Sequence, residues 1–319
     1  MAVMRRIPDP ALELLREQAD VWVSPHERPL HEDELLDAAR GADAALTLLH
    51  DRVDAAFFDA AGEQLRVVAN VAVGYDNIDV EEAARRGVVI TNTPGVLTDA
   101  TADLAMALML AVIRRVPEGD RLIRAGRKWD WDMFFMLGAS LQGKTLGVVG
   151  LGKIGAATAR RARGFGMEIA YTQRNRADAA LEGELGGARY MELDELLAQS
   201  DVVTLHVPLT PQTRHLISAE RLALMRDTAY LVNTARGPVV DEAALAHALS
   251  EGQIAGAGLD VFENEPEVHP DLLELDNVVL LPHLGSATIE TRTAMGELAA
   301  RNVVSVLTGK PPITPVNLG

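Results

Sequence analysis

The sequence contains no cysteine and no long hydrophobic run. The absence of thiols from its 319 residues excludes disulfide bonds, thiolate catalysis and cysteine-ligated zinc or iron–sulfur sites. The longest apolar run, LAMALMLAVI at 104–113, has 10 residues, about half of a membrane span. It predicts a buried helix. The start, MAVMRRIPDP, lacks the apolar core of a signal peptide. We therefore expect a cytoplasmic protein without a membrane segment.

Positive charge is also scarce. The chain has 30 Lys and Arg against 46 Asp and Glu, a formal net charge of −16. Nucleic-acid binding needs a basic footprint, and anionic membrane surfaces attract basic segments, so we expect neither partner. An anionic small molecule stays compatible with this charge, because a few local arginines can reverse the field inside a cleft.

Short β-branched runs alternate with helical patterns along the chain. Residues 44–49, 65–70 and 87–92 have the composition of buried strands, and a long helical pattern from Asp99 to Ile123 is interrupted at Pro117. The alternation restarts at Lys144 and continues to a strand at 278–283 and a last helix at about 288–307. Such alternation predicts parallel sheets. The length suggests about two domains. We expect an α/β protein with two doubly wound parallel-sheet domains.

A glycine fingerprint, GLGKIG, follows the strand TLGVV. Gly150, Gly152 and Gly155 have the G-x-G-x-x-G spacing at the start of a predicted helix. In this context the first glycine permits a tight turn and the second lets the backbone approach a pyrophosphate. The third allows close helix–strand packing, and the helix N-terminus offers free N–H donors to the anion. The pattern predicts a dinucleotide site.

The segment YTQRNR, which follows the next predicted strand, lacks the acid that usually holds the adenosine ribose of NAD. Gln173, Arg174 and Arg176 occupy its region. A glutamine removes the repulsion of a 2′-phosphate, and arginines can pair with that phosphate through charge-assisted hydrogen bonds. We expect a preference for NADP(H), with NAD(H) also accepted. The alternative is that both arginines belong to a solvated turn.

Polar residues follow three later strands at the point where each strand ends. Arg236 follows AYLVNT, Asp260 and Glu265 follow GAGL, and His283 follows VVLLP. Ligands of doubly wound sheets bind at the strand C-termini. An arginine could hold the carboxylate of a 2-keto acid, and a histidine could give the proton to its keto oxygen while a cofactor delivers hydride. The glutamate would orient the imidazole and stabilise its charged form.

These motifs resemble the D-isomer-specific 2-hydroxyacid dehydrogenases, and within them the glyoxylate/hydroxypyruvate reductases. The resemblance covers almost the whole chain. It is carried by RRIP, VAVGYDNIDV, GVVITNTPGVLTDATADLAMALML, GKTLGVVGLGKIG, HVPLTPQTRHLI, LVNTARGPVVDEAAL, GAGLDVFENEP and LPHLGSATIETR.

The resemblance implies a role for each matching residue. It makes Arg236, Glu265 and His283 the catalytic set, and it has the substrate bound by backbone N–H groups of Val73 and Gly74 together with Arg236 and His283. The implied cofactor contacts are Thr101, Gly150, Leu151, Gly152, Lys153, Ile154, Gly155, Gln173, Arg174, Arg176, His206, Val207, Pro208, Thr213, Thr234, Ala235, Asp260 and Gly285.

The resemblance also implies a domain arrangement. Residues 1–98 and 287–319 would form a flavodoxin-like substrate domain, and residues 99–286 a Rossmann-type cofactor domain. A segment at about 100–142 would make a homodimer, and its aromatic stretch WDWDMFF contains Trp129, Trp131 and Phe134, one of which could reach a partner's active site.

Other interpretations stay open. The substrate could be another D-2-hydroxy acid, such as 3-phosphoglycerate or D-lactate, or the chain could be a dinucleotide-sensing binding protein on the same fold. Formate dehydrogenases also resemble it, but they have an amide at the place of Glu265. No metal is expected, because His26 and His31 in HERPLHE are five residues apart with a proline between them and cannot share a helix face.

Overall fold

A computed structural model describes residues 1–316 and divides the chain into two compact units. The first unit spans residues 1–97 and 287–319, and the second spans Thr98–Ser286. The second unit thus begins one residue earlier than the sequence indicated. Each unit contains its own parallel sheet, which confirms the expected α/β fold class.

In the described residues of the first unit, the parallel sheet has the strand order β2-β1-β3-β4-β5, which is the flavodoxin-like order. Its strands are β1 (Ala2–Val3), β2 (Trp22–Val23), β3 (Ala44–Thr47), β4 (Val67–Asn70) and β5 (Val89–Thr91). Its helices are α1 (Asp9–Arg16), α2 (Glu32–Ala39), α3 (Ala55–Ala61), α4 (Val80–Arg85) and α13 (Ile289–Leu307).

Alternate residues of these strands belong to two separate apolar cores. Val3, Leu46 and Val67 pack with α1 and α13 on one face of the sheet. Ala45 and Val68 pack with α2, α3 and α4 on the other face. Because both faces are covered, the strands are apolar throughout, and their polar residues concentrate where each strand ends.

The edge strand β5 is covered by the end of the described chain. Pro315 forms an antiparallel bridge with Thr91, and the Val316 N–H donates to the Ile90 carbonyl at 2.8 Å. This pairing satisfies backbone groups that an open sheet edge would leave exposed.

In the second unit the order is β12-β11-β10-β9-β6-β7-β8 across the described residues. This is the Rossmann order, extended by one strand. The strands are β6 (Thr145–Val149), β7 (Glu168–Thr172), β8 (Arg189–Tyr190), β9 (Val202–Leu205), β10 (Tyr230–Asn233), β11 (Gly256–Leu259) and β12 (Val278–Leu280). The helices are α5 (Thr98–Ile113), α6 (Val116–Arg124), α7 (Lys153–Gly164), α8 (Ala179–Glu184), α9 (Leu193–Gln199), α10 (Ala219–Leu222), α11 (Glu242–Ser250) and α12 (Pro270–Leu273), with a 3₁₀ turn at Gly237–Val239.

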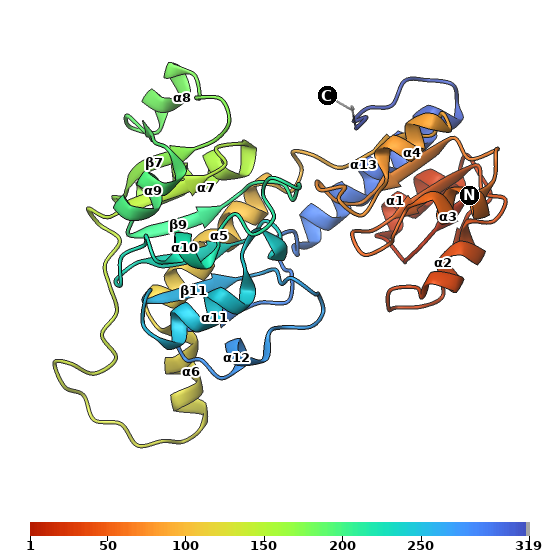
Figure 1. The fold of residues 1–319 in the computed structure, drawn as a ribbon. Helices are drawn as coiled ribbons and strands as arrows, with labels where there is room; N and C mark the ends of the chain where they lie inside the picture. The colour runs from red at the N-terminus through yellow and green to blue at the C-terminus, as the bar shows by residue number, and fades with distance from the viewer. Residues whose placement is uncertain (317–319) are drawn as a thin grey trace. The chain divides into compact units, whose positions relative to one another are not determined.

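Helices cover both faces of this second sheet (Figure 1). Helices α5 and α7 pack on one face against Leu146 and Val148. Helices α9, α10 and α11 pack on the other face against Val203 and Leu231. The sheet is therefore doubly wound, and its strand C-termini point to a single edge.

The helical pattern expected from Asp99 to Ile123, with an interruption at Pro117, forms two helices, and the break between them lies before the proline. Helix α5 ends at Ile113, and Arg115 adopts a left-handed conformation with φ 53° before α6 begins. Pro117 lies inside the first turn of α6, where a missing N–H is tolerated. Helix α6 and the irregular residues 125–140 extend away from the sheet (Figure 1).

Candidate functional site

The glycine fingerprint forms the turn between β6 and α7. Gly150 has φ 96°, and a Cβ there would lie 2.8 Å from the His206 carbonyl oxygen. A Cβ on Gly155 would lie 2.1 Å from the Gly150 oxygen. A Cβ on Gly152 would meet nothing within 4 Å. Internal packing therefore explains the first and third glycines, whereas the second leaves open space beside the helix N-terminus.

The N-terminus of α7 lacks a side-chain cap. Gly152 is the N-cap residue, no side-chain cap hydrogen bond forms there, and the first turn with Lys153 and Ile154 carries no acid. Uncapped N–H groups and the positive end of the helix dipole favour an anion at this place. This geometry fits the pyrophosphate of a dinucleotide.

The three residues expected near the adenosine ribose, Gln173, Arg174 and Arg176, differ in their contacts. The Gln173 Oε1 accepts a hydrogen bond from the Leu151 N–H at 3.1 Å, which ties the end of β7 to the glycine turn. Arg176 donates to both oxygens of Glu182, at 2.8 and 2.9 Å, and this pairing lowers the pKa of Glu182 to about 2. Arg174 is exposed and has no ion pair within residues 1–316. Of the two arginines, Arg174 is the one available to a ligand.

The residues after β9 and β10 line the same sheet edge as the glycine turn. His206 follows β9, and its Nε2 lies 3.0 Å from the Thr204 Oγ1, while burial lowers its pKa to about 4. Thr213 Oγ1 donates to the Pro208 carbonyl at 2.6 Å, which closes a loop over residues 208–213, directly after Val207.

Thr234, which follows β10, has a buried hydroxyl that no described residue bonds. A buried hydroxyl without a partner costs free energy unless a ligand or water satisfies it. Together with the open space beside Gly152 and the uncapped end of α7, this hydroxyl fits a bound dinucleotide.

Arg236 is positioned by the residue that ends β10. The buried Asn233 accepts from the Ala235 N–H at 3.0 Å and donates to the Arg236 carbonyl at 2.9 Å. A Cβ on the next residue, Gly237, would lie 1.9 Å from the Phe262 carbonyl carbon. The loop that carries Arg236 therefore packs directly against the loop that leads to Glu265.

His283 and Glu265 are in direct contact. The His283 Nδ1 lies 2.8 Å from the Glu265 Oε2, and the other oxygen, Oε1, accepts from the Phe262 N–H at 3.1 Å. With Nδ1 directed at the carboxylate, Nε2 is the imidazole nitrogen left for a reaction, and it has no partner within residues 1–316. Both side chains keep some solvent exposure, 25% and 18%.

Asp260 fixes the turn that presents this histidine. Its two oxygens accept from the Leu284 N–H at 2.6 Å and the Gly285 N–H at 2.8 Å, and burial raises its pKa. The Thr101 Oγ1, on α5, donates to the Gly285 carbonyl at 3.0 Å. His283 itself has φ 55°, so its backbone is held in a conformation that costs free energy. The expected cofactor residues Thr101, Asp260 and Gly285 thus support the histidine.

Glu242, which sequence reasoning missed, braces the loop before Glu265. This carboxylate is 7% exposed and accepts from the Glu263 N–H at 2.7 Å and the His269 N–H at 2.8 Å. The Glu263 carboxylate in turn accepts from the Glu242 N–H at 2.8 Å. Only its place in GPVVDEAAL, soon after Arg236, could have drawn attention to Glu242.

The first unit carries the expected substrate loop after β4. The N–H groups of Val73 and Gly74 have no acceptor within residues 1–316. Free backbone N–H groups in a row can bind an anion. The side chains that shape this loop, Asn70 and Asn92, were not identified from the sequence.

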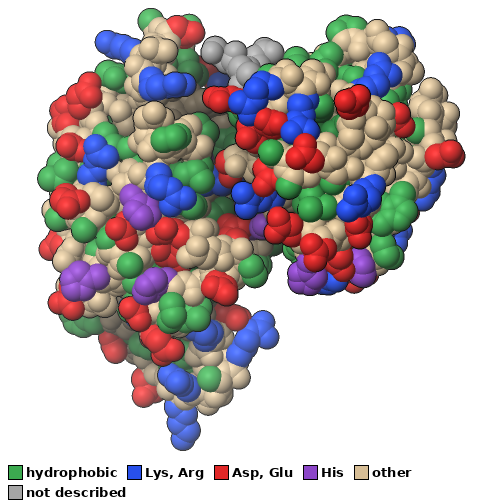
Figure 2. Space-filling view, turned by 45° about the vertical axis from the view of Figure 1, so that its right-hand side comes forward, with side chains coloured by type: hydrophobic (Ala, Val, Ile, Leu, Met, Phe, Trp, Pro, Cys, Tyr) green, Lys and Arg blue, Asp and Glu red, His purple; other side chains and the backbone are tan. Residues whose placement is uncertain are grey.

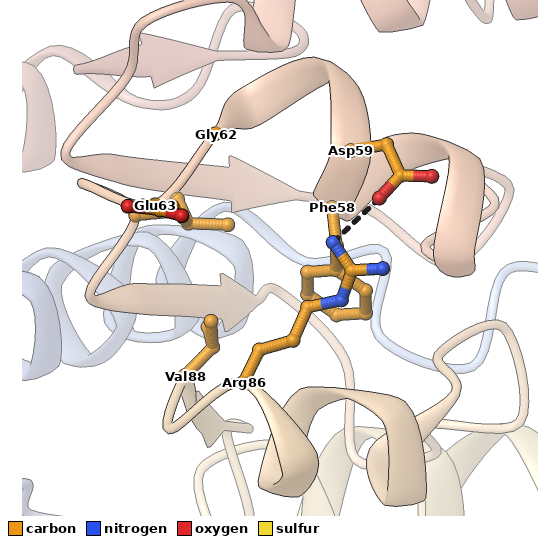
Figure 3. A pocket seen from close by; sticks show the side chains of 7 residues that line it. Phe58, Asp59, Gly62, Glu63, Arg86 and Val88 are labelled. Carbon is orange, nitrogen blue, oxygen red and sulfur yellow. Dashed lines mark ion pairs between the residues drawn. The ribbon is translucent and has the colours of Figure 1, made fainter.

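A separate cavity of about 570 Å³ lies where β4 and β5 begin, the opposite edge of the first sheet. Arg86 points across it toward Asp59 at 2.7 Å and lies over the ring of Phe58 (Figure 3). Arg86 also pairs with Glu82 at 2.6 Å. Its charge is therefore already matched within the unit, and the cavity has no link to the strand C-termini.

The described residues show no metal cluster and no membrane helix. Within residues 1–316, no group of three or more His, Asp and Glu side chains could hold a metal ion. No helix in the described part of the chain is long and apolar enough to cross a membrane. Figure 2 shows acidic and basic side chains interspersed over one face rather than separated into a basic patch.

Comparison with known proteins identifies the chain's relatives. Residues 106–285 match the model of the NAD-binding domain of D-isomer-specific 2-hydroxyacid dehydrogenases. A glyoxylate reductase of Thermococcus onnurineus is 53% identical over 99% of this chain and 95% of its own. A crystal structure of a glyoxylate reductase from Paecilomyes thermophila superimposes with a TM-score of 0.89 at 37% identity, covering 99% and 97% of the two chains.

One solved relative was determined with a cofactor. It is an NADPH-dependent glyoxylate/hydroxypyruvate reductase of Sinorhizobium meliloti in complex with NADP and malonate, with a TM-score of 0.85, 36% identity and coverage of 99% and 95%. The second unit is thus a nicotinamide dinucleotide-binding domain. The chain belongs to the D-isomer-specific 2-hydroxyacid dehydrogenase family and is an oxidoreductase of 2-keto acids and their 2-hydroxy counterparts.

Proposed function

We propose that this chain reduces glyoxylate and hydroxypyruvate to glycolate and D-glycerate. The contact of 2.8 Å between His283 Nδ1 and Glu265 Oε2 carries the proposal, because it leaves Nε2 as a proton donor at the C-terminal edge of a dinucleotide-binding sheet. Relatives that are 53% and 52% identical to this chain are glyoxylate reductases, which supports glyoxylate as a substrate.

Each residue of the catalytic set has a separate task in this proposal. Bound NAD(P)H supplies hydride to the C2 carbon of the keto acid. His283 gives its Nε2 proton to the keto oxygen, and Glu265 stabilises the imidazolium and fixes the ring. Arg236 polarises the keto group and pairs with the substrate carboxylate through its guanidinium. In the first unit, the Val73 and Gly74 N–H groups are donors that can bind a carboxylate.

The proposal includes a preference for NADPH over NADH. Gln173, in place of an acid, puts no negative charge beside a 2′-phosphate, and Arg174 has no ion-pair partner within residues 1–316. Arg176 would have to release Glu182 before it could contribute.

The proposal also includes a homodimer built through residues 100–142. Trp131, Met133 and Phe134 are 76%, 71% and 83% exposed, and Trp129 stacks on Phe135 with ring centroids 5.9 Å apart. Contiguous exposed aromatics of this kind mark protein interfaces. The cytoplasmic location expected from the sequence stays a prediction.

Initial rates test the substrate and the cofactor together. Glyoxylate, hydroxypyruvate, pyruvate and 3-phosphohydroxypyruvate are each reduced with NADPH and with NADH. We expect the highest kcat/KM for the first two substrates with NADPH. A higher value for pyruvate or for the phosphorylated acid would replace the proposed substrate. Dinucleotide binding without turnover of any of the four would favour a dinucleotide-sensing protein.

A further inference from the structure

In the loop after β4, consecutive backbone carbonyls form hydrogen bonds within the described part of the first unit, whereas the N–H groups of the same peptides do not. Three consecutive carbonyls accept hydrogen bonds from the first unit: Ala72 from the Thr93 N–H at 2.8 Å, Val73 from the Asn92 Nδ2 at 2.8 Å, and Gly74 from the Asn70 Nδ2 at 3.0 Å. The N–H groups that share those three peptide planes, of Val73, Gly74 and Tyr75, have no acceptor within residues 1–316.

Peptide geometry connects the two observations. In a planar trans peptide the C=O and the following N–H point in opposite directions. A carbonyl held toward the core therefore turns the next N–H away from it. One backbone N–H and two asparagine side chains thus set the directions of three successive N–H groups.

Asn70 is locked in place by its own contacts. It is fully buried at the end of β4, and its Oδ1 accepts from the Thr47 Oγ1 at 3.1 Å. Besides the Gly74 carbonyl, its Nδ2 donates to the Asn77 Oδ1 at 3.1 Å. The Asn77 Nδ2 in turn donates to the Leu48 carbonyl at 3.1 Å. Because both Nδ2 hydrogens of Asn70 are used, its amide cannot rotate without losing a buried bond.

Asn92 is held from the other side of the loop. Its backbone carbonyl accepts from the Thr314 Oγ1 at 2.6 Å, and its N–H donates to the Thr314 carbonyl at 3.3 Å. Thr314 is fixed by Asn302 of α13, whose Oδ1 accepts from the Thr314 N–H at 3.0 Å. The segment that covers β5 therefore also positions the Asn92 side chain.

We propose that Asn70 and Asn92 are positioning residues that aim the N–H groups of Val73, Gly74 and Tyr75 as a three-donor site for the substrate carboxylate. This inference rests on the proposed function and adds a third donor, Tyr75, to the two that the resemblance implied. Neither asparagine touches the substrate. Each acts through the peptide plane that it holds.

Two variants of Asn92 test the inference, because this residue is only partly buried. Asn92→Ala removes the amide, and Asn92→Asp keeps its size but replaces the donor by an acceptor. With the Val73–Gly74 peptide released, we expect KM for glyoxylate and Ki for the inert analogue oxamate to rise together by about tenfold in both variants. NADPH affinity and the thermal midpoint should change little.

Asn277→Ala is the matched control. Its Nδ2 also donates to a backbone carbonyl, that of Leu249, at 3.2 Å, but it lies where β12 begins rather than at a strand C-terminus. We expect this variant to keep the wild-type KM and Ki. A purely structural role of Asn92 would instead lower the thermal midpoint in both variants and leave KM and Ki close to the wild-type values.

Hydrogen exchange of the wild type supplies a measurement that needs no variant. Oxamate added to the NADPH complex should slow exchange of the Val73, Gly74 and Tyr75 amides. Two results would overturn this inference and leave the proposed function intact. One is unchanged turnover, KM and Ki in both Asn92 variants. The other is an active wild type in which oxamate does not slow exchange of the three amides. Absence of turnover in the wild type would refute the proposed function itself.

Discussion

Arg176 and Glu182 form a two-point ion pair, in which the arginine Nε and Nη2 lie 2.8 and 2.9 Å from the two carboxylate oxygens. The Tyr171 hydroxyl donates to the same carboxylate at 2.5 Å. This arrangement separates the two arginines of YTQRNR into one that closes the turn after β7 and one, Arg174, that is available to a ligand.

Arg174→Ala should therefore reduce the preference for NADPH. Loss of one charge-assisted bond to a 2′-phosphate should lower kcat/KM with NADPH by roughly 10- to 100-fold and leave the value with NADH almost unchanged. Steady-state kinetics with both cofactors measure the effect. Arg176→Ala is the matched control, with a smaller change expected, and equal losses in the two variants would contradict the distinction.

His283→Ala should abolish reduction while dinucleotide still binds. Removal of a positioned proton donor should lower kcat by roughly 100- to 10,000-fold. Fluorescence titration with NADPH should give a Kd close to that of the wild type. Glu265→Gln retains a hydrogen-bond acceptor for Nδ1 but loses the charge, so we expect an intermediate kcat. Wild-type turnover by the His283 variant would remove it as the proton donor.

Acid should destabilise the second unit through His206. Burial lowers its pKa to about 4 from 6.5, so the unfolded state takes up the proton first as the pH falls. This contribution to the free energy of unfolding is fully present above pH 6.5 and is lost between pH 6.5 and 4. Because His206 is only partly buried by surface area, we expect a loss of roughly 1–2 kcal/mol at pH 5. Urea unfolding of the wild type and of His206→Gln at pH 7.5 and pH 5 measures this loss, because the variant should lose less unfolding free energy between the two pH values. Equal losses in both proteins would assign the acid sensitivity to other groups.

Glu242→Gln should destabilise the loops that carry Arg236 and Glu265. A glutamine has one carbonyl oxygen for the two N–H groups, of Glu263 and His269, that the buried carboxylate satisfies. We expect a loss of roughly 1–3 kcal/mol in the free energy of unfolding. Glu251→Gln, on an exposed residue just after α11, should be neutral. Similar stabilities for the two variants would show that the Glu242 contacts contribute little.

A double substitution, Trp131→Ser with Phe134→Ser, should convert a dimer to a monomer. Removal of two exposed aromatic side chains from an interface costs association free energy without unfolding the subunit. Sedimentation velocity reports the change. Leu273→Ser, at a residue 61% exposed on α12, controls for the loss of surface apolar area. A double variant that stays dimeric would locate the interface elsewhere.

The sequence predicts most strands and the polar residues at their ends, because a strand covered on both faces is apolar until it reaches the sheet edge. It does not predict β2 and β8, since two residues carry no periodic pattern. It predicts a break in the helix near Pro117. It does not predict the left-handed backbone of Arg115, because that conformation is usually expected only of glycine.

The finer geometry of the site depends on contacts between distant segments. Glu182 takes Arg176 only because the short helix α8 forms, and its sequence AALEGE has little helical pattern. Asn70 and Asn92 hold the loop after β4 from two strands separated by α4, and their amides serve carbonyls that no spacing rule connects. The residue type shows that an asparagine amide can donate a hydrogen bond. Which carbonyl accepts it depends on which segments the fold brings together.

The return of the chain through α13 has a consequence for biosynthesis. Helix α13 supplies Ala299, Ala300 and Val303 to one face of the first sheet, which until then has only α1 as a cover. Because domains fold as units while the chain emerges from the ribosome, residues 98–286 can mature first. Residues 1–97, although made earliest, would keep the part of that apolar face not covered by α1 exposed until α13 leaves the ribosome. We therefore expect the first unit to complete its folding after the second unit and to be the more exposed to chaperones and proteases during synthesis.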